Sequence, residues 1–290
     1  MKTQRFGIEI EFTGMTRLRA ARVLANYFET TEKFIGGIYN KYHIQDSIGR
    51  IWKIVSDASI KTLDGSNTKC EMVSPICHYQ DIETIQEIVE KLRVAGMKVN
   101  TSTGIHIHID SKDHTAQSLK NLANIMSSKE DLLFEALAVD PERAIRWCKK
   151  VDTKFLDKLN SRSKKNMRKI REIWYNGHDE ANIHYSETRY RALNLHSVWQ
   201  KGTVEFRCFN STTQAEKIKT YIQLCLAISH QAKTQSGATR RHTSTTNAKY
   251  TFRTWLLRLG LIGDEFKTAR RQLLSNLSGN IAWRNRGIAA

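Results

Sequence analysis

Three short segments of the chain alternate strictly between apolar and polar residues, and this constrains the fold more than any other feature. They are FGIEIEF at 6–12, GIHIHID at 104–110 and TVEFRCF at 203–209. Because successive side chains of a β-strand point to opposite faces, each segment predicts a strand with one apolar and one polar face. The apolar faces need helices as cover, so the chain is expected to form a sheet with helices on one side.

The polar faces of these strands carry an unusual set of side chains. The simplest alternative is that they meet water, but a solvated face usually mixes Lys, Thr, Ser and Gln with Glu. Carboxylates suit Mg²⁺ or Mn²⁺, and an arginine offers a planar fork for a phosphoryl group. The set therefore favours a site for a divalent cation and an anion, formed by Glu9 with Glu11, His106 with His108, and Glu205 with Arg207.

One further carboxylate, Glu71 in CEMVSP, is expected on a neighbouring strand. A zinc hydrolase is the competing interpretation, because His-x-His with His114 or His196 as a third ligand makes a zinc site. The additional glutamates and the arginine favour hard cations over zinc.

Composition narrows the class of protein. The chain has 290 residues, of which 40% are hydrophobic and two are proline, so it can bury a large core. It has no run of eighteen apolar residues and no apolar leader, so we expect a cytoplasmic protein without a membrane span. Its five cysteines form no CxxC pair, which favours reduced, structural thiols.

The formal charge of +17 is concentrated in two segments. Residues 143–172 hold twelve basic and three acidic residues, and residues from 237 onward hold ten and two. Either segment is a solvated helix face or a surface for a polyanion. A nucleic-acid-binding protein is therefore a second alternative. Four aromatic residues could then stack on bases, although core packing is the expected role for most of them: Trp147, Trp174, Tyr175 and Trp199.

The remaining pattern predicts an α+β chain with an antiparallel sheet. Thr16 and Asp81 are expected to cap helices, the second of which ends at Gly96, and 34–50 is expected to be irregular. Residues 115–150 are expected to be helical with a new start at Asp140 and Pro141. RYRALNL at 189–195 and TVEFRCF are expected to form a hairpin through the turn QKG, followed by a helix with a buried stripe. We expect one domain at 1–235, with a basic helical insertion at about 140–180, and a basic helical extension at 236–290.

The order of these motifs, FGIEIEF, WKIVSDASI, CEMVSP, STGIHIHID, RYRALNL and TVEFRCFNST, resembles the putative amidoligase family of the glutamine-synthetase-like carboxylate-amine ligases. The resemblance runs from about residue 5 to about residue 233. It implies a curved antiparallel sheet with helices on its convex face, like the glutamine synthetase catalytic domain. The concave face would hold two or more Mg²⁺ or Mn²⁺ ions between ATP and a carboxylate substrate.

The resemblance also implies a role for each matching residue. Five would be metal ligands: Glu9, Glu11, Glu71, His106 and Glu205. His108 would lie near the nucleotide phosphates and Arg207 would clamp the transferred phosphoryl group. Substrate or phosphate contacts would come from Arg191, Asn194, Asp57 and Ser59, with Asp57 also a possible acceptor of the amine proton. Glutamine synthetase has more than one glutamate in the region where this chain has only Glu71.

The activity implied is ATP-dependent amide formation through an acyl phosphate, with a small-molecule or peptide acid and an amine donor as substrates. Loops at 34–50 and 176–188 would exclude water as lids. A further alternative combines the two interpretations: a ligase whose acid or amine is carried on a polyanion that the basic segments attract.

Overall fold

The computed structural model describes residues 1–63 and 65–282, and these form two compact units. The unit of residues 2–109 and 209–222 is called the N-terminal unit here. The C-terminal unit comprises Met1, residues 110–208 and the chain from 223 onward. Arg284 and Arg286 of the predicted basic extension lie outside the described residues.

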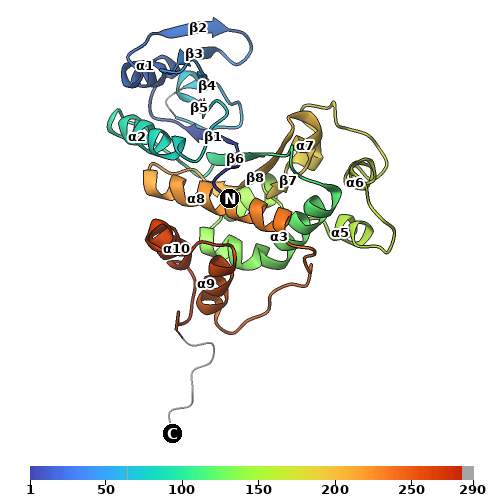
Figure 1. The fold of residues 1–290 in the computed structure, drawn as a ribbon. Coiled ribbons are helices and arrows are strands. Elements are labelled where there is room, and N and C mark those ends of the chain that lie inside the picture. Colours follow the sequence, from blue (N-terminus) through green and yellow to red (C-terminus); the bar gives the residue numbers. More distant parts are fainter. Residues whose placement is uncertain (64, 283–290) are drawn as a thin grey trace. The chain divides into compact units, whose positions relative to one another are not determined.

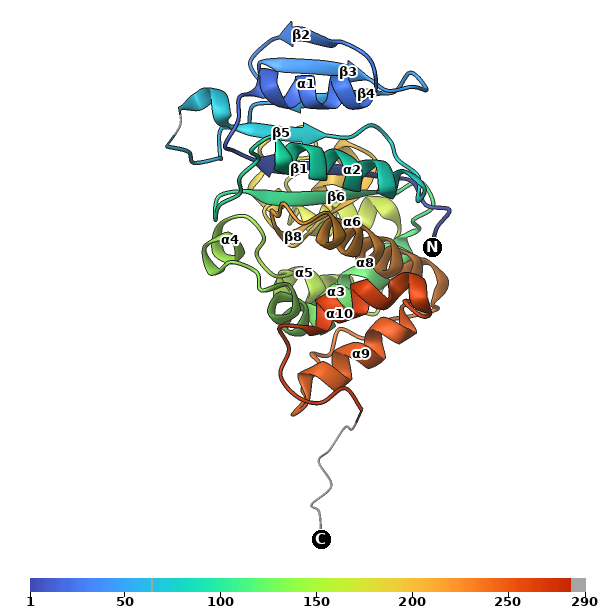
Figure 2. The ribbon, with the colours of Figure 1, turned by 90° about the vertical axis from the view of Figure 1, so that its left-hand side faces the viewer.

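The N-terminal unit contains an antiparallel sheet in the order β2-β3-β4-β5-β1-β6. Helices α1 and α2 lie on one face of this sheet (Figures 1 and 2). The mixed α/β class and the antiparallel pairing are as predicted. In chain order the elements are β1 (Phe6–Phe12), α1 (Arg17–Tyr27), β2 (Glu32–Gly36), β3 (Lys41–Gln45), β4 (Ile51–Val55), β5 (Cys70–Val73), α2 (Asp81–Val94) and β6 (Gly104–Asp110).

Strand β1 shows why alternation fixes this sheet. Phe6, Ile8, Ile10 and Phe12 are each at most 2% exposed. A one-residue slip in register would exchange these four side chains for Gly7, Glu9 and Glu11, so burial holds the register.

The chain turns tightly at Gly14 after this strand. The φ of Gly14 is 88°, and a Cβ at this position would lie 2.6 Å from the Gly96 carbonyl oxygen. The turn therefore requires glycine, because any side chain would meet both a strained backbone and a backbone clash.

Two helix boundaries follow the sequence and one differs. Thr16 caps α1 by accepting a hydrogen bond from the Arg19 N–H, and α2 ends before Gly96. The expectation that Asp81 caps α2 is wrong, because Gln80 holds the cap position without a side-chain bond. Asp81 instead accepts from the His78 N–H and pairs with Arg50 at 2.9 Å.

The segment 34–50 is not irregular, contrary to the expectation from its glycines. It contributes β2 and β3, and its last turn is fixed by the buried carboxylate of Asp46. Asp46 accepts from the Ile48 and Arg50 N–H groups, from the Arg50 Nε and from the Trp52 Nε1. Gly36 and Gly49, with φ of 73° and 86°, mark the tight connections between paired strands. Whether the segment acts as a lid stays a prediction.

The C-terminal unit is mainly helical (Figure 1). Its elements are α3 (Ala116–Leu137), α4 (Pro141–Arg146), α5 (Thr153–Leu159), α6 (Met167–Trp174), β7 (Leu193–Asn194), α7 (His196–Gln200), β8 (Thr203–Asn210), α8 (Ala215–Thr234), α9 (Ala248–Arg258) and α10 (Lys267–Leu274). The boundaries between the two units fall within β6, β8 and α8. The predicted domain division at residue 235 stays a prediction.

Several sequence expectations are confirmed in these helices. Asp140 caps α4 with Pro141 in its first turn, and the α8 stripe of Ile218, Ile222, Cys225 and Ile228 is buried. β7 pairs with β8 as expected, with Asn194 opposite Glu205, but only Leu193 and Asn194 of the predicted run RYRALNL form a strand. The predicted turn QKG at 200–202 is present, but α7 precedes it and begins where the His196 N–H donates to Asn194 Oδ1 at 2.9 Å.

The structure also bears on the reactivity of the cysteines and on whether a helix could cross a membrane. All five cysteines are unbridged and buried, and burial raises the pKa of Cys70 and Cys77 to about 12, so these thiols are inert at neutral pH. Within the described ranges, none of the helices combines the length and the apolarity that a membrane crossing requires.

A buried carboxylate links α3 to the segment after α4. Glu130 is 1% exposed, and the Val151 N–H lies 3.0 Å from both of its carboxylate oxygens. Burial outweighs this hydrogen bond and raises the pKa of Glu130 to about 7. The folded state therefore holds this proton more tightly than the unfolded state does.

We expect Glu130→Gln to flatten the pH dependence of stability. A raised folded-state pKa gives stability that is complete below the unfolded pKa and is lost as the pH rises through about 7. Urea unfolding at pH 5.5 and pH 8 should show a wild-type loss that exceeds the variant's by about 2 kcal/mol. Glu135→Gln, on the exposed side of the same helix, is the control and should behave as wild type. An equal pH slope in Glu130→Gln would contradict this expectation.

Candidate metal site

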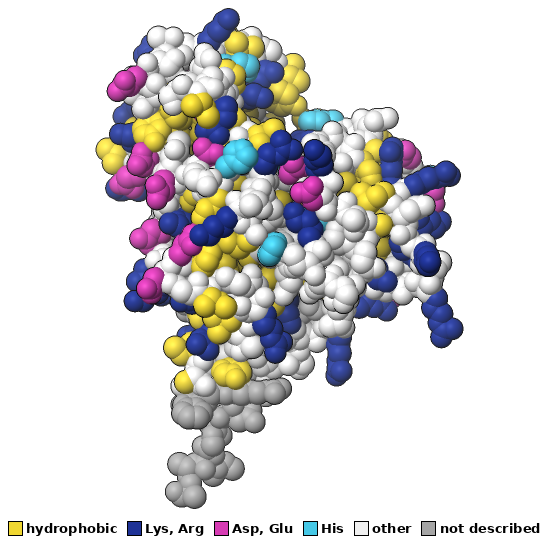
Figure 3. All heavy atoms as spheres, in the orientation of Figure 1, with side chains coloured by type: hydrophobic (Ala, Val, Ile, Leu, Met, Phe, Trp, Pro, Cys, Tyr) yellow, Lys and Arg dark blue, Asp and Glu magenta, His cyan; other side chains and the backbone are white. Residues whose placement is uncertain are grey.

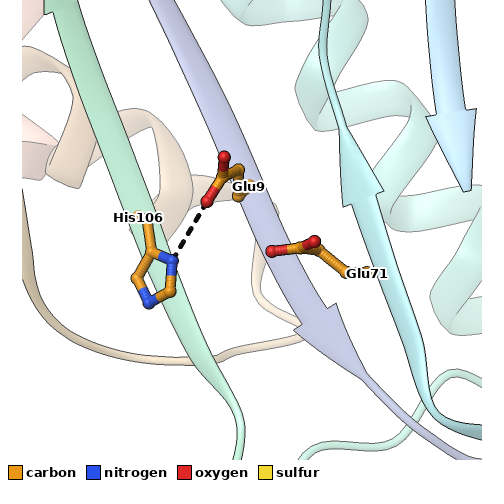
Figure 4. A group of neighbouring side chains, drawn as sticks. All are labelled: Glu9, Glu71 and His106. Atoms are coloured by element: carbon orange, nitrogen blue, oxygen red, sulfur yellow. Dashed lines mark hydrogen bonds and ion pairs between the residues drawn. The ribbon is translucent and has the colours of Figure 1, made fainter. Parts of the chain in front are cut away.

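Strand pairing in the N-terminal unit places the predicted ligands next to one another. Glu9 on β1 lies directly opposite His106 on β6, and Glu11 lies opposite Glu71 on β5. Directly opposed residues on one face have their Cβ atoms about 5 Å apart, so the register alone brings these groups together. Figure 4 shows Glu9, Glu71 and His106 projecting from three adjacent strands toward a common space.

The His106 imidazole lies between two carboxylates. Its Nδ1 is 3.2 Å from Glu9 Oε2, and its Nε2 is 3.8 Å from Glu11 Oε1. His108 approaches the same cluster, with its Nε2 3.4 Å from Glu9 Oε1. Both imidazoles and Glu11 are buried, so these interactions occur with little screening by water.

Among the described residues of the N-terminal unit, two groups of side chains have the spacing of a metal site. Glu9, Glu71 and His106 each offer one ligand atom, and these atoms lie within 4.8 Å of one another. Glu11, Asp57 and Glu71 form a second group that meets the same limit. Glu71 belongs to both groups, which is the arrangement that two neighbouring cations sharing one carboxylate would need.

Asp57 reaches the second group from the segment that follows β4. Its Oδ1 accepts a 2.7 Å hydrogen bond from the Ser59 N–H, which fixes the turn on which it lies. The sequence predicts Asp57 as a substrate or proton contact and Glu71 as the only carboxylate ligand of its region. The structure also groups Asp57 with Glu71 and Glu11, and nothing in the spacing VSDASI indicates this proximity.

The chemistry of these donors fits divalent cations of the Mg²⁺ or Mn²⁺ type. Four carboxylates gather at one sheet face, half-buried or buried, where their mutual repulsion is costly unless positive charge lies between them. Glu11, Asp57 and Glu71 offer three carboxylate oxygens. Glu9, Glu71 and His106 offer two carboxylate oxygens and one imidazole nitrogen. Hard divalent cations accept both sets of ligands.

Hydrogen bonds hold both the carboxylate and the backbone of Glu11. The Gly104 N–H donates to Glu11 Oε2 at 2.6 Å, and the Ser211 hydroxyl donates to the Glu11 carbonyl oxygen at 2.6 Å. Such outer contacts fix the direction in which a ligand points. Sequence reasoning misses both, since Gly104 and Ser211 are far from Glu11 along the chain and neither carries a distinctive signal.

Three further predicted residues lie together in the C-terminal unit. Arg207 Nη1 is 2.5 Å from Glu205 Oε1, and Asn194 Nδ2 donates to Glu205 Oε2 at 2.6 Å. All three are at most 4% exposed, and Arg207 also lies over the Tyr190 ring at 6.0 Å. The expectation that Glu205 and Arg207 share one site with Glu9 and Glu11 stays a prediction.

Arg191 has protein partners of its own. Its Nη1 donates to the Lys150 carbonyl at 3.0 Å, and its Nη2 is 3.4 Å from Asp152 Oδ2. It also lines a cavity of about 230 Å³ with Asp152 and Trp174. Its predicted contact with a substrate is compatible with that position and stays a prediction.

The zinc interpretation loses one of its candidate ligands. His114 Nδ1 and Nε2 each lie 3.0 Å from a serine hydroxyl, of Ser118 and Ser229, and burial lowers the pKa of His114 to about 4. Both ring nitrogens therefore have structural partners. The other candidate, His196, is 2.6 Å from the Tyr175 hydroxyl through its Nδ1.

The aromatic residues considered as stacking platforms pack against other rings. Trp174 contacts Phe155 and Trp199, and Tyr175 contacts Trp199 at a ring-centroid distance of 5.5 Å. Trp147 packs edge-on against Tyr190 at 5.2 Å. These ring contacts show packing within the protein, in which Tyr175 is buried and the three tryptophans are half-buried.

The comparison with known families gives a match, which covers most of the chain. The model of a family described as "putative amidoligase enzyme" matches residues 2–229, which is most of the chain and includes every predicted site residue. No curated protein matches the chain.

We expect Glu71→Gln to affect both groups of ligands at once. In EDTA the variant should melt at a higher temperature than wild type, because one of four mutually repelling carboxylates is removed. Mn²⁺ should raise the wild-type melting temperature by binding the folded state, and the variant should need at least about tenfold more Mn²⁺ for the same rise.

The control for this measurement is Glu83→Gln, which removes an exposed carboxylate on α2. It should reproduce the wild-type Mn²⁺ response. An unchanged Mn²⁺ response in Glu71→Gln would show that the two groups do not hold a cation.

Proposed function

The chain belongs to the amidoligase family, and from this premise we propose that it is an ATP-dependent carboxylate-amine ligase that works through an acyl phosphate. The fold proposed for it is that of the glutamine synthetase catalytic domain, a curved sheet with helices on the convex face. The proposal rests above all on the position of Glu71 in two ligand groups of one sheet face.

Two cation positions are proposed from these groups. Glu9, Glu71 and His106 would hold one ion, and Glu11, Asp57 and Glu71 the other. When bound, such ions neutralise the charge of ATP phosphate oxygens during phosphoryl transfer. Because Asp57 is then a ligand, another basic group is the preferred acceptor of the amine proton.

The remaining residues are proposed to bind and orient the substrates. His108, held near Glu9, would donate to a nucleotide phosphate, and Ser59 would contact the same region from the turn that positions Asp57. Arg207, positioned by Glu205 and Tyr190, would clamp the transferred phosphoryl group. Glu205 would be a further cation ligand and Asn194 would orient it, while Arg191 would attract the acid substrate.

The proposed reaction has two steps. An oxygen of the substrate carboxylate attacks the γ-phosphorus, the bond to the bridging oxygen breaks, and ADP leaves. The amine nitrogen then attacks the acyl carbon, inorganic phosphate leaves, and the amine loses a proton to a basic group. Activation is needed because a carboxylate is a poor electrophile, and holding the amine next to the acyl phosphate favours it over water. The segment 176–188 is proposed as a lid that excludes water.

We expect hydroxylamine to trap the activated acid. Wild-type protein with ATP and Mg²⁺ or Mn²⁺ would be incubated with amino acids, dicarboxylates and short peptides, each with hydroxylamine as the amine. A matching acid should give a hydroxamate, measured as its iron(III) complex, together with an equal amount of ADP. Glu71→Gln should lower the rate at least about a hundredfold and Glu83→Gln should not, because only the first disturbs charge stabilisation.

The same measurement can contradict the proposal. ADP release that is independent of every acid would indicate an ATPase. Equal hydroxamate formation by Glu71→Gln and wild type would remove the proposed metal site from the reaction.

As a second proposal, the acid or the amine is carried on a polyanion that a basic surface of the protein binds. Lys and Arg side chains gather at the right-hand edge in Figure 3, where Figure 1 draws α5 and α6. Arg162 and Lys164 in this region are exposed, whereas Arg168 and Lys169 are paired with Glu172. A nucleic-acid-binding protein without ligase activity would use the same surface.

We expect Arg162→Gln with Lys164→Gln to weaken binding of a labelled 20-nucleotide RNA or DNA in fluorescence anisotropy. The slope of log K against log salt should fall by about 2, as expected for two lost phosphate contacts. The control pair, Arg19→Gln with Lys33→Gln, removes the same charge from exposed positions of the N-terminal unit. Equal weakening by both pairs would contradict a specific surface.

A further inference from the structure

The C-terminal unit contains a cavity of about 890 Å³ that lies apart from every residue assigned above. Its walls come from α3, α8 and α9 and from the segment 236–247 between the last two helices. Small-molecule sites commonly have volumes of about 300–1,000 Å³, so the cavity is large enough for an organic ligand. Most of its lining lies beyond residue 229, where the family match ends.

The charge of the cavity wall is purely positive. Lys129 and Arg258 line it, and the described lining residues include no aspartate or glutamate. Lys129 is half-buried, and its ammonium donates to Thr243 Oγ1 at 2.6 Å. Burial lowers the pKa of Lys129, and the positive charge of Arg258 lowers it further. The two cations therefore repel each other, and the described wall has no acidic side chain to neutralise them.

The rest of the wall is rich in hydrogen-bonding groups. Thr245 and Thr251 place their hydroxyls 2.8 Å apart, and the Thr254 hydroxyl donates to the Tyr250 carbonyl at 2.9 Å. Such hydroxyls can both donate and accept hydrogen bonds to a polar ligand.

We propose that this cavity binds a small organic phosphate, a phosphate monoester of a polar molecule such as a sugar. A phosphate monoester carries a charge near −2 at neutral pH, which the pair of Lys129 and Arg258 would balance. The threonine hydroxyls would bind the polar remainder of the ligand. Trp255 is 6% exposed, so it offers no open ring face for a stacked base, and this favours a small molecule over a nucleic acid.

The site is independent of the proposed ligase activity. It would hold its ligand through residues that the family match mostly does not include. Its occupation requires no divalent cation, since the two anion-binding groups are protein side chains.

The test uses the full chain in EDTA at fixed ionic strength. Isothermal titration calorimetry would be run with inorganic phosphate, with ribose 5-phosphate and with ribose. We expect both phosphates to bind and ribose alone not to bind. Lys129→Gln and Arg258→Gln should each weaken ribose 5-phosphate at least about tenfold, the effect of losing one charged hydrogen bond.

Two control variants show whether the effect is specific to this cavity. Arg253→Gln removes a cation from the same helix α9, outside the cavity lining, and should leave affinity within about twofold of wild type. Glu71→Gln should also bind normally, which separates the cavity from the proposed metal site. Because Arg258 is exposed, its variant is expected to fold even if Lys129→Gln does not.

Three outcomes would overturn the proposal. One is that neither phosphate binds. Another is that both bind equally well to wild type and to Arg258→Gln. The third is that a nucleic-acid duplex binds in a manner that depends on Arg258 while ribose 5-phosphate does not bind.

Discussion

Repulsion among four carboxylates on one sheet face is the constraint on which the candidate site depends. The pairing of β1 with β5 and β6 forces Glu9, Glu11, Glu71 and the imidazole of His106 together, and the turn after β4 adds Asp57. The apolar side chains on the opposite face hold that register, because a slip would expose the core. Hydrophobic burial thus offsets the electrostatic cost of the cluster, and a bound cation would relieve it.

The part of the site that the sequence can predict is the part that alternation controls. Glu9, Glu11 and His106 lie on short strands whose alternate apolar residues must face the core. The polar residues of these strands therefore share the opposite face. Asp57 cannot be placed in this way, because it lies in a turn whose path depends on the Ser59 N–H and on contacts distant in sequence. The orienting bond from Gly104 to Glu11 is hidden for the same reason.

The fold shows a similar division. Long amphipathic helices such as α2 and α8 are predictable because their buried stripes extend over several turns. Strands β2 and β3 escape prediction because β2 is exposed along much of its length and its glycines suggest irregular structure. The turn that follows them is fixed by Asp46, Arg50 and Asp81, a polar network that joins it to α2 and has no periodic signature.

Two cations that share Glu71, on the face formed by β1, β5 and β6, would unite these features in one site. Anomalous scattering from crystals soaked in Mn²⁺ with a non-hydrolysable ATP analogue would locate the ions. We expect two manganese peaks, both within coordination distance of a Glu71 oxygen, one also near Glu9 and His106 and the other near Glu11 and Asp57. Manganese bound elsewhere with no peak at Glu71, or an ordered Glu71 turned away from both groups, would contradict this arrangement.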